Sequence, residues 1–353
     1  MSGPIIATVG RNSLVFEAWR RPRNGDRGAE ATPEPAPRAN ERPTIGLALG
    51  GGAARGFAHI GILNTLAANG IQPDVIVGTS MGAVIGGCFA GGQLSPFEAW
   101  ARGLTRRGIL SYLDVSLSGA GLIGGGKLAA RLEEIFGDTQ IENLPIRFAS
   151  ITTEVGTGHE IWLTRGRMVE ALRASYALPG IFPPVRLGGR WLVDGALVNP
   201  VPVSAARALG ARLVIAVNLN ADLLGRGTTI ASHGPDEMDE KYRQEMAKRQ
   251  GLRGIFGPER ALKRQFLGNA ERPGIPTVMV EAFNIMQDRI TRARLAGDPP
   301  DVTISPRLGH IGSFDFHRAR EAIEIGARAA QRAIELVGEA VTALAPRAAS
   351  NGK

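Results

Sequence analysis

Two short apolar segments in the first quarter of the chain are each followed by a glycine-containing turn and then by a stretch of small, mostly apolar residues. They cover residues 44–49 and 75–77. Continuous apolar runs of this kind are typical of strands that are buried on both faces of a parallel sheet. A chain with this pattern must also place helices on the faces of its sheet, because parallel neighbours are joined by crossover connections.

The alternation of apolar strands and amphipathic stretches continues to the C-terminus. Ser95 and Glu98 have the spacing of a capping box and predict the start of a helix after residue 94. Other strands are predicted at residues 148–153, 161–164, 191–193, 213–218 and 302–304, and helices at about 54–69, 81–90, 127–136, 167–175, 203–210, 277–295 and from a cap at Ser313 to about 344. Strands that alternate with helices predict an α/β fold with a mostly parallel central sheet.

Composition divides the chain into regions. Arg, Pro, Gly and Glu dominate residues 20–43, and such a composition cannot form a packed core. We therefore expect a disordered, basic and Pro-rich arm at residues 1–43, one folded domain at residues 44–335, and the end of the last helix with a tail at residues 336–353. The pattern breaks at about residues 222–276, where we expect a basic insertion.

The net charge restricts the expected partners. The sequence has 41 Lys and Arg against 33 Asp and Glu, a net charge of +8, which favours anionic partners. Only 5% of the residues are aromatic, and no basic stretch is interleaved with the aromatic residues that base stacking requires. Nucleic acid is therefore not expected as a partner. Peripheral contact with an anionic membrane surface is the better hypothesis, and the alternative is a charge that only keeps the protein soluble.

Cysteine content and hydropathy restrict the compartment. The single cysteine, Cys88, excludes a disulfide framework and a cysteine-built zinc site, and it suits a reducing compartment. No apolar run reaches the roughly 20 residues of a membrane-spanning helix, and the N-terminal residues lack the pattern of a secretory signal. We expect a cytoplasmic protein, with peripheral contact at the inner membrane as an option.

A serine lies in the turn after the second apolar segment. The turn has the G-x-S-x-G pattern, with Gly78, Thr79, Ser80, Met81 and Gly82. A sharp turn between a strand and a helix exposes the serine hydroxyl, and small flanking residues let the backbone turn so tightly. The amides at the start of the following helix favour a negative charge that develops beside the serine. The pattern predicts a nucleophilic serine.

A glycine-rich loop follows the first apolar segment. It contains Gly50, Gly51, Gly52, Ala53, Ala54, Arg55 and Gly56. A dinucleotide-binding fingerprint is disfavoured, because neither register completes G-x-G-x-x-G and no acidic residue ends the second strand. Two roles remain open, namely an oxyanion hole built from main-chain amides and a tight turn for close packing.

A carboxylate follows the apolar strand predicted at residues 191–193. The residues are Asp194, Gly195 and Ala196. A carboxylate at the end of a strand is well placed to point into a site at the rim of the sheet. An isolated Asp-Gly pair is more often a simple turn, so its role depends on the other two motifs.

Together, the glycine-rich loop, the serine turn and the Asp-Gly-Ala motif resemble the patatin-like phospholipase family, in particular a bacterial branch similar to the catalytic domain of neuropathy target esterase. The resemblance covers about residues 44–330 and includes residues 174–184. It implies a three-layer α/β/α fold and a serine hydrolase that acts in lipid degradation, cleaving acyl esters of phospholipids or lysophospholipids without a metal or organic cofactor.

The resemblance also implies roles for single residues. Ser80 is expected to be the nucleophile and Asp194 the proton acceptor of a catalytic dyad. The oxyanion loop is expected to comprise Gly51, Gly52, Ala53, Ala54, Arg55 and Gly56. Ala53 departs from the family pattern, which has the middle glycine of G-x-G-x-x-G at this position.

Several alternatives stay open at this point. A Ser-His-Asp triad needs a histidine after the aspartate in the chain, and His310 and His317 satisfy that order. A membrane-associated regulatory protein on a hydrolase scaffold, with little catalysis, is the alternative from a different functional class. Arg55 either contacts a lipid phosphate or caps the loop.

Overall fold

The protein is described here by a computed structural model, which covers residues 42–105, 126–223, 268–269 and 272–345. All of these residues belong to one compact unit, Asn40–Lys353. The predicted arm at residues 1–43 and most of the basic insertion at 222–276 lie outside the described residues.

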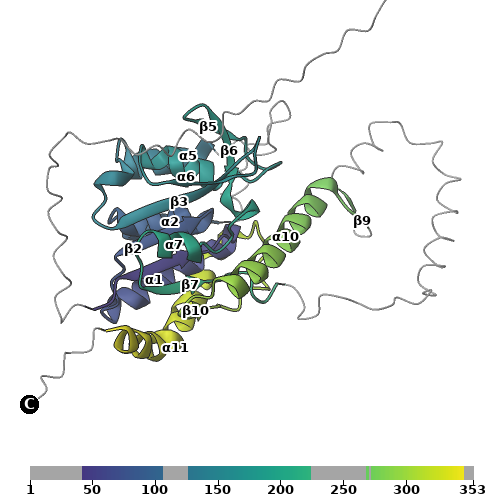
Figure 1. The fold of residues 1–353 in the computed structure, drawn as a ribbon. Coiled ribbons are helices and arrows are strands. Elements are labelled where there is room, and N and C mark those ends of the chain that lie inside the picture. Colours follow the sequence, from purple (N-terminus) through teal and green to yellow (C-terminus); the bar gives the residue numbers. More distant parts are fainter. Residues whose placement is uncertain (1–41, 106–125, 224–267, 270–271, 346–353) are drawn as a thin grey trace, which may run out of the picture. The chain divides into compact units, whose positions relative to one another are not determined.

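An eight-stranded sheet forms the centre of the fold (Figure 1). Its strand order is β10-β7-β1-β2-β3-β6-β5, and β4 pairs with β3. The strands are β1 (Ile45–Leu49), β2 (Val75–Thr79), β3 (Arg147–Glu154), β4 (Glu160–Leu163), β5 (Val185–Leu187), β6 (Arg190–Asp194), β7 (Leu213–Val217) and β10 (Val302–Ile304), and a separate hairpin consists of β8 (Gly268–Asn269) and β9 (Arg272–Pro273).

The sheet is mostly parallel, as the apolar runs predict. Strands β10, β7, β1, β2 and β3 are parallel, whereas β4, β5 and β6 run antiparallel to their neighbours. Leu49 at the end of β1 is opposite Gly78 near the end of β2. The turns that follow these two strands therefore meet at the same edge of the sheet.

Helices cover both faces of the sheet. They are α1 (Ala58–Ala68), α2 (Met81–Ala90), α3 (Leu94–Arg102), α5 (Gly126–Phe136), α6 (Met168–Ser175), α7 (Val203–Ala208), α10 (Ile275–Gly297) and α11 (Ala319–Leu344), with short 3₁₀ turns η2 (Ala53–Phe57), η3 (Ile141–Asn143), η4 (Gly195–Leu197) and η6 (Phe316–Arg318). The fold is thus the expected α/β architecture.

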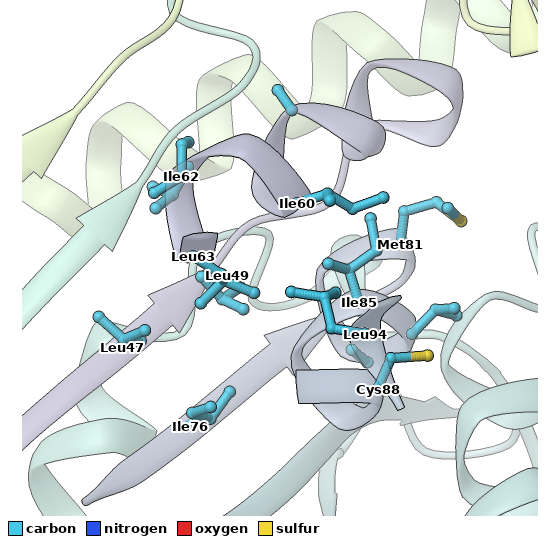
Figure 2. Packing of buried hydrophobic residues seen from close by; sticks show 14 of the residues in the cluster. Leu47, Leu49, Ile60, Ile62, Leu63, Ile76, Met81, Ile85, Cys88 and Leu94 are labelled. Carbon is cyan, nitrogen blue, oxygen red and sulfur yellow. The ribbon is translucent and has the colours of Figure 1, made fainter. Parts of the chain in front are cut away.

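Two hydrophobic clusters, one on each face, hold the layers together. Because successive side chains of a strand point to opposite faces, Leu47 and Leu49 belong to the cluster under α1 and α2, while Ala48 belongs to the cluster under α7. Figure 2 shows the first cluster, in which Leu47, Leu49 and Ile76 of the sheet pack with Ile60 and Ile85 of the helices. The apolar runs therefore make both halves of the core.

Two predicted helix caps are wrong. Helix α3 begins at Leu94, its N-cap is Gln93, and no side chain caps it. Burial of Leu94 and Phe97 places Ser95 inside the helix, since tertiary packing outweighs a local cap worth about 1 kcal/mol. Ser313 does not cap the last helix either, because α11 begins only at Ala319.

No helix in the described part of the chain is both long enough and apolar enough to cross a membrane.

Candidate active site

Ser80 lies at the tip of a sharp turn between β2 and α2. Its backbone angles, φ 55° and ψ −125°, are unusual for a residue with a side chain. A Cβ atom at Gly78 would overlap with Ala83, and one at Gly82 would overlap with the carbonyl oxygen of Leu49. Both glycines of G-x-S-x-G are therefore required by close backbone packing around the serine.

The hydroxyl of Ser80 donates a hydrogen bond directly to the carboxylate of Asp194, over 2.7 Å between Oγ and Oδ2. Ser80 is 8% exposed and Asp194 is 2% exposed. The two residues are 114 positions apart in the sequence. They meet because β6 pairs antiparallel with β3, which brings Asp194 opposite Thr152 at the edge where β2 ends.

The carboxylate of Asp194 is held in place by its own chain. The amide of Ala196 donates to Oδ1 at 2.9 Å, and the amide of Asp194 donates to the carbonyl of Ala177. A Cβ atom at Gly195 would overlap with the carbonyl oxygen of Ile151. Glycine after the aspartate thus permits the tight approach of this turn to β3.

Burial changes the acidity of Asp194. Loss of solvation raises the pKa of its carboxyl group from 3.8 to about 7, and the hydrogen bonds from Ala196 and Ser80 partly oppose the rise. A carboxylate with a pKa near neutrality can both accept and release a proton at physiological pH. A serine hydroxyl that already donates to such a group can transfer its proton without a further residue.

The glycine-rich loop lies beside Ser80. A Cβ atom at Gly51 would be 3.5 Å from the Cβ atom of Ser80. Three amides of the loop already have acceptors, since Gly51 donates to Pro200, Ala54 to Ser313 and Arg55 to Gly52. Of the predicted oxyanion loop, these three amides are thus engaged by the protein itself.

Other amides beside Ser80 remain available. Within the described residues, the amides of Gly52, Ala53 and Met81 have no acceptor in the protein. Ala53 has a φ of 47°, the left-handed conformation that favours glycine. Alanine in place of the family's glycine at position 53 therefore keeps the backbone conformation that glycine favours, and the alanine side chain makes this conformation strained.

Arg55 points away from solvent and anchors the loop. Its guanidinium donates to Asn284 at 3.2 Å, and to the carbonyl of Ile311 and the hydroxyl of Ser313 at 3.5 Å each. Burial lowers its pKa to about 10, opposed by the charges of Glu281 and Asp222. These contacts are those of a residue that fixes the loop.

Two histidines of the described residues, His59 and His310, have partners other than Ser80 and Asp194. His59 is fully buried, its Nε2 lies 2.8 Å from the carbonyl oxygen of Gly50, and burial lowers its pKa to about 4. His310 is exposed and pairs with Glu321 at 2.9 Å. The direct contact between Ser80 and Asp194 leaves no histidine between the two.

Sequence reasoning missed several residues that support the site. The hydroxyl of Ser175 accepts the Ser80 amide at 2.9 Å and donates to the carbonyl of Ile151. The carbonyl of Asn199 accepts the hydroxyl of Thr79 at 2.8 Å. The available signal for Ser175 was its place in residues 174–184, whereas nothing local indicated a role for Asn199.

Helix α10 supplies a further polar contact. Asn220 donates to the carbonyl of Gly51 and to the side chain of Gln287. The side-chain oxygen Oε1 of Gln287 lies 3.7 Å from the position of a Cβ atom at Gly51.

As for metals, the described residues contain no group of three or more His, Cys, Asp or Glu that could hold an ion.

Comparisons with known proteins place the site motifs in a family context. A family model described as patatin-like phospholipase matches residues 47–207, a span that contains both Ser80 and Asp194. The chain is similar to an uncharacterized NTE family protein of Mycobacterium tuberculosis, with 34% identity over 84% of this chain and 93% of that protein.

Two more distant similarities have smaller coverage or lower identity. Patatin-like phospholipase domain-containing protein 7 of Mus musculus is 35% identical over 50% of this chain and 14% of that protein. The solved structure of VipD from Legionella pneumophila aligns with a TM-score of 0.43 and 12% identity, over 84% of this chain and 67% of that chain.

Proposed function

Since this chain belongs to the patatin-like phospholipase family and is related to its NTE family proteins, we propose that it is a serine esterase that hydrolyses the acyl ester bonds of phospholipids or lysophospholipids. Membership of the family supports a lipid hydrolase in general terms. The observation that supports the catalytic assignment is the 2.7 Å hydrogen bond between Ser80 and Asp194.

In the proposed acylation step, the hydroxyl oxygen of Ser80 attacks the carbonyl carbon of the ester. Its proton moves to Asp194, along the hydrogen bond that already joins them. The tetrahedral intermediate then collapses, the bond to the alcohol oxygen breaks, and Asp194 returns the proton to the departing alcohol. The acyl group stays on Ser80 as an ester.

The negative oxygen of the intermediate requires hydrogen-bond donors. We assign this role to the amides of Gly52, Ala53 and Met81, which lack protein acceptors among the described residues. A preorganised donor of this kind lowers the barrier by about 2.7–4 kcal/mol. The amides of Gly51 and Ala54 act indirectly in this scheme, by holding the loop against Pro200 and Ser313.

Deacylation repeats the same chemistry with water. A water molecule attacks the acyl carbonyl carbon while Asp194 accepts its proton. The proton then passes to the oxygen of Ser80 as the bond between this oxygen and the acyl carbon breaks. The free enzyme and a fatty acid result. Because an alcohol leaves more readily than an amine, the dyad is better suited to esters than to peptides.

The assay is hydrolysis of short p-nitrophenyl acyl esters, followed by lipid profiling of a membrane extract. Ser80→Ala and Asp194→Asn are each expected to abolish turnover in a folded protein, and a fluorophosphonate label should modify Ser80 alone. Ser95→Ala changes an exposed serine on α3 and is the matched control. Undiminished hydrolysis by folded Ser80→Ala protein would refute the assignment.

The triad alternative has its own test. His310→Ala and His317→Ala are expected to retain ester hydrolysis if Asp194 acts alone on Ser80. Loss of turnover in either folded variant would favour a triad. Vesicle binding without turnover on any ester would instead favour a regulatory protein on a hydrolase scaffold.

A further inference from the structure

Helix α10 buries several polar side chains and exposes several large apolar ones. Its buried residues are Phe283 and the polar Asn284, Gln287, Asp288 and Thr291, and each of the polar four is 7% exposed or less. Its outward face carries the large apolar residues Val278, Met279, Ile285 and Met286, each between 44% and 50% exposed. A soluble surface helix normally buries its apolar stripe.

The exposed apolar residues lie on one side of the helix. Val278, Ala282 and Ile285 follow each other at spacings of four and three residues, and Met279 and Met286 flank them, as expected of one helical face. All five residues are exposed. We call Val278, Met279, Ala282, Ile285 and Met286 the apolar face of α10.

The polar face of α10 is attached to the catalytic loop. Asn284 accepts a hydrogen bond from Arg55, and Gln287 accepts one from Asn220, which also binds Gly51. At its N-terminal half, the methyl group of Met279 lies against Gly180. Since a helix with side chains is about 10 Å across, the apolar face lies within about 10 Å of the loop beside Ser80.

The exposed charges that border the apolar face are two arginines, Arg289 and Arg292, and one acidic residue, Glu281. Arg289 lies four residues after Ile285, Arg292 follows three residues later, and both are exposed. Arg292 pairs with Asp288 on its inner side. Long basic side chains at the border of an apolar stripe suit an interface with anionic headgroups, because the stem can lie in the apolar layer while the charge reaches the phosphates.

We propose that the apolar face of α10 docks onto an anionic membrane surface, inserting Val278, Ile285 and Met286 into the headgroup region. This inference rests on the proposed function, because it gives the esterase direct access to lipid in a bilayer. The hydrogen bonds that α10 accepts from Arg55 and Asn220 couple the docked helix to the loop beside Ser80. Docking thus brings the site to the membrane surface.

The direct test is flotation of the full-length protein with phosphatidylcholine vesicles, with and without phosphatidylglycerol. Ser80→Ala is used as the background so that lipid is not consumed. Adding Ile285→Glu is expected to weaken binding to the anionic vesicles by about tenfold or more, because an aliphatic side chain that inserts into the headgroup region is replaced by a charge that repels phosphate. Adding Leu336→Glu, at a residue 56% exposed on α11, is the matched control and should leave binding unchanged.

A second variant reports insertion directly. In Met286→Trp the added indole should shift its fluorescence to shorter wavelength when anionic vesicles are added, beyond any shift of the unsubstituted protein. Ile285→Glu in the Ser80-containing enzyme should hydrolyse a soluble p-nitrophenyl ester at the normal rate and vesicle lipid more slowly. These two results support docking independently of flotation.

Other outcomes overturn the proposal. Equal vesicle binding by the Ile285→Glu and Leu336→Glu proteins rules out docking through α10. A dimer that dissociates on Ile285→Glu, with vesicle binding unaffected, assigns the face to a second copy of the chain instead. Failure of the proposed function is distinguishable, since it appears as absent ester hydrolysis in the unsubstituted protein, whatever the vesicles show.

Discussion

Asp194→Asn is expected to make the protein more stable at alkaline pH while it abolishes ester hydrolysis. In the folded protein, burial raises the pKa of Asp194 from 3.8 to about 7. Ionising this carboxyl group therefore costs more in the folded state than in the unfolded chain. Asparagine keeps the shape and the acceptor for the Ala196 amide, but it never carries the charge.

The size of the stability difference between the two proteins, and its dependence on pH, follow from the linkage between proton binding and folding. Below pH 3.8 the carboxyl group is neutral in both states and adds no penalty. As the pH rises toward 7, the unfolded chain releases its proton first, so the unsubstituted protein loses stability. Above about pH 7 the loss of unfolding free energy levels off at about 4 kcal/mol. This is the shift of the Asp194 pKa from 3.8 to about 7, at about 1.36 kcal/mol for each pKa unit.

The assay is urea unfolding of both proteins between about pH 4 and 8.5, with the free energy of unfolding obtained by linear extrapolation. The stability advantage of Asp194→Asn should be small near pH 4 and grow to several kcal/mol by pH 8. Asp138→Asn, at an exposed position after α5, controls for the loss of a surface carboxylate. An advantage that does not change with pH, or a less stable Asp194→Asn protein at pH 8, would show that burial does not disfavour the ionised carboxylate.

Three further predictions concern the same site. Because Asp194 must be ionised to accept a proton, kcat/KM for a p-nitrophenyl ester should rise with pH through about 7 to a plateau, and a rate that falls over this range would contradict the role of a base. Ala53→Gly should raise the free energy of unfolding by about 1 kcal/mol, because it relieves the strain at a φ of 47°, whereas a decrease measured by urea unfolding would show that Ala53 is not strained. Ser175→Ala removes the acceptor of the buried Ser80 amide and should lower stability by about 1–3 kcal/mol together with kcat, and normal values of both would mean that this hydrogen bond is dispensable.

Local sterics made parts of the site readable from the sequence. At G-x-S-x-G, both glycines are needed because a Cβ atom would overlap with Ala83 at Gly78 and with Leu49 at Gly82. A requirement of this kind can be recognised from a short stretch of consecutive residues. The apolar runs likewise predicted β1 and β2, because burial on both faces requires them. The caps expected at Ser95 and Ser313 were wrong because packing of distant residues decided where these helices begin.

The sequence by itself determined which backbone segments turn tightly and which strands are buried, because these properties depend on neighbouring residues. Only the tertiary structure decided that Oγ of Ser80 and Oδ2 of Asp194 lie 2.7 Å apart, which amides of the loop are already engaged, and that α10 buries several polar side chains. Each of these depends on strand pairing or helix packing between segments far apart in the chain. Such contacts are set by the sum of many weak interactions, and no short motif encodes that sum.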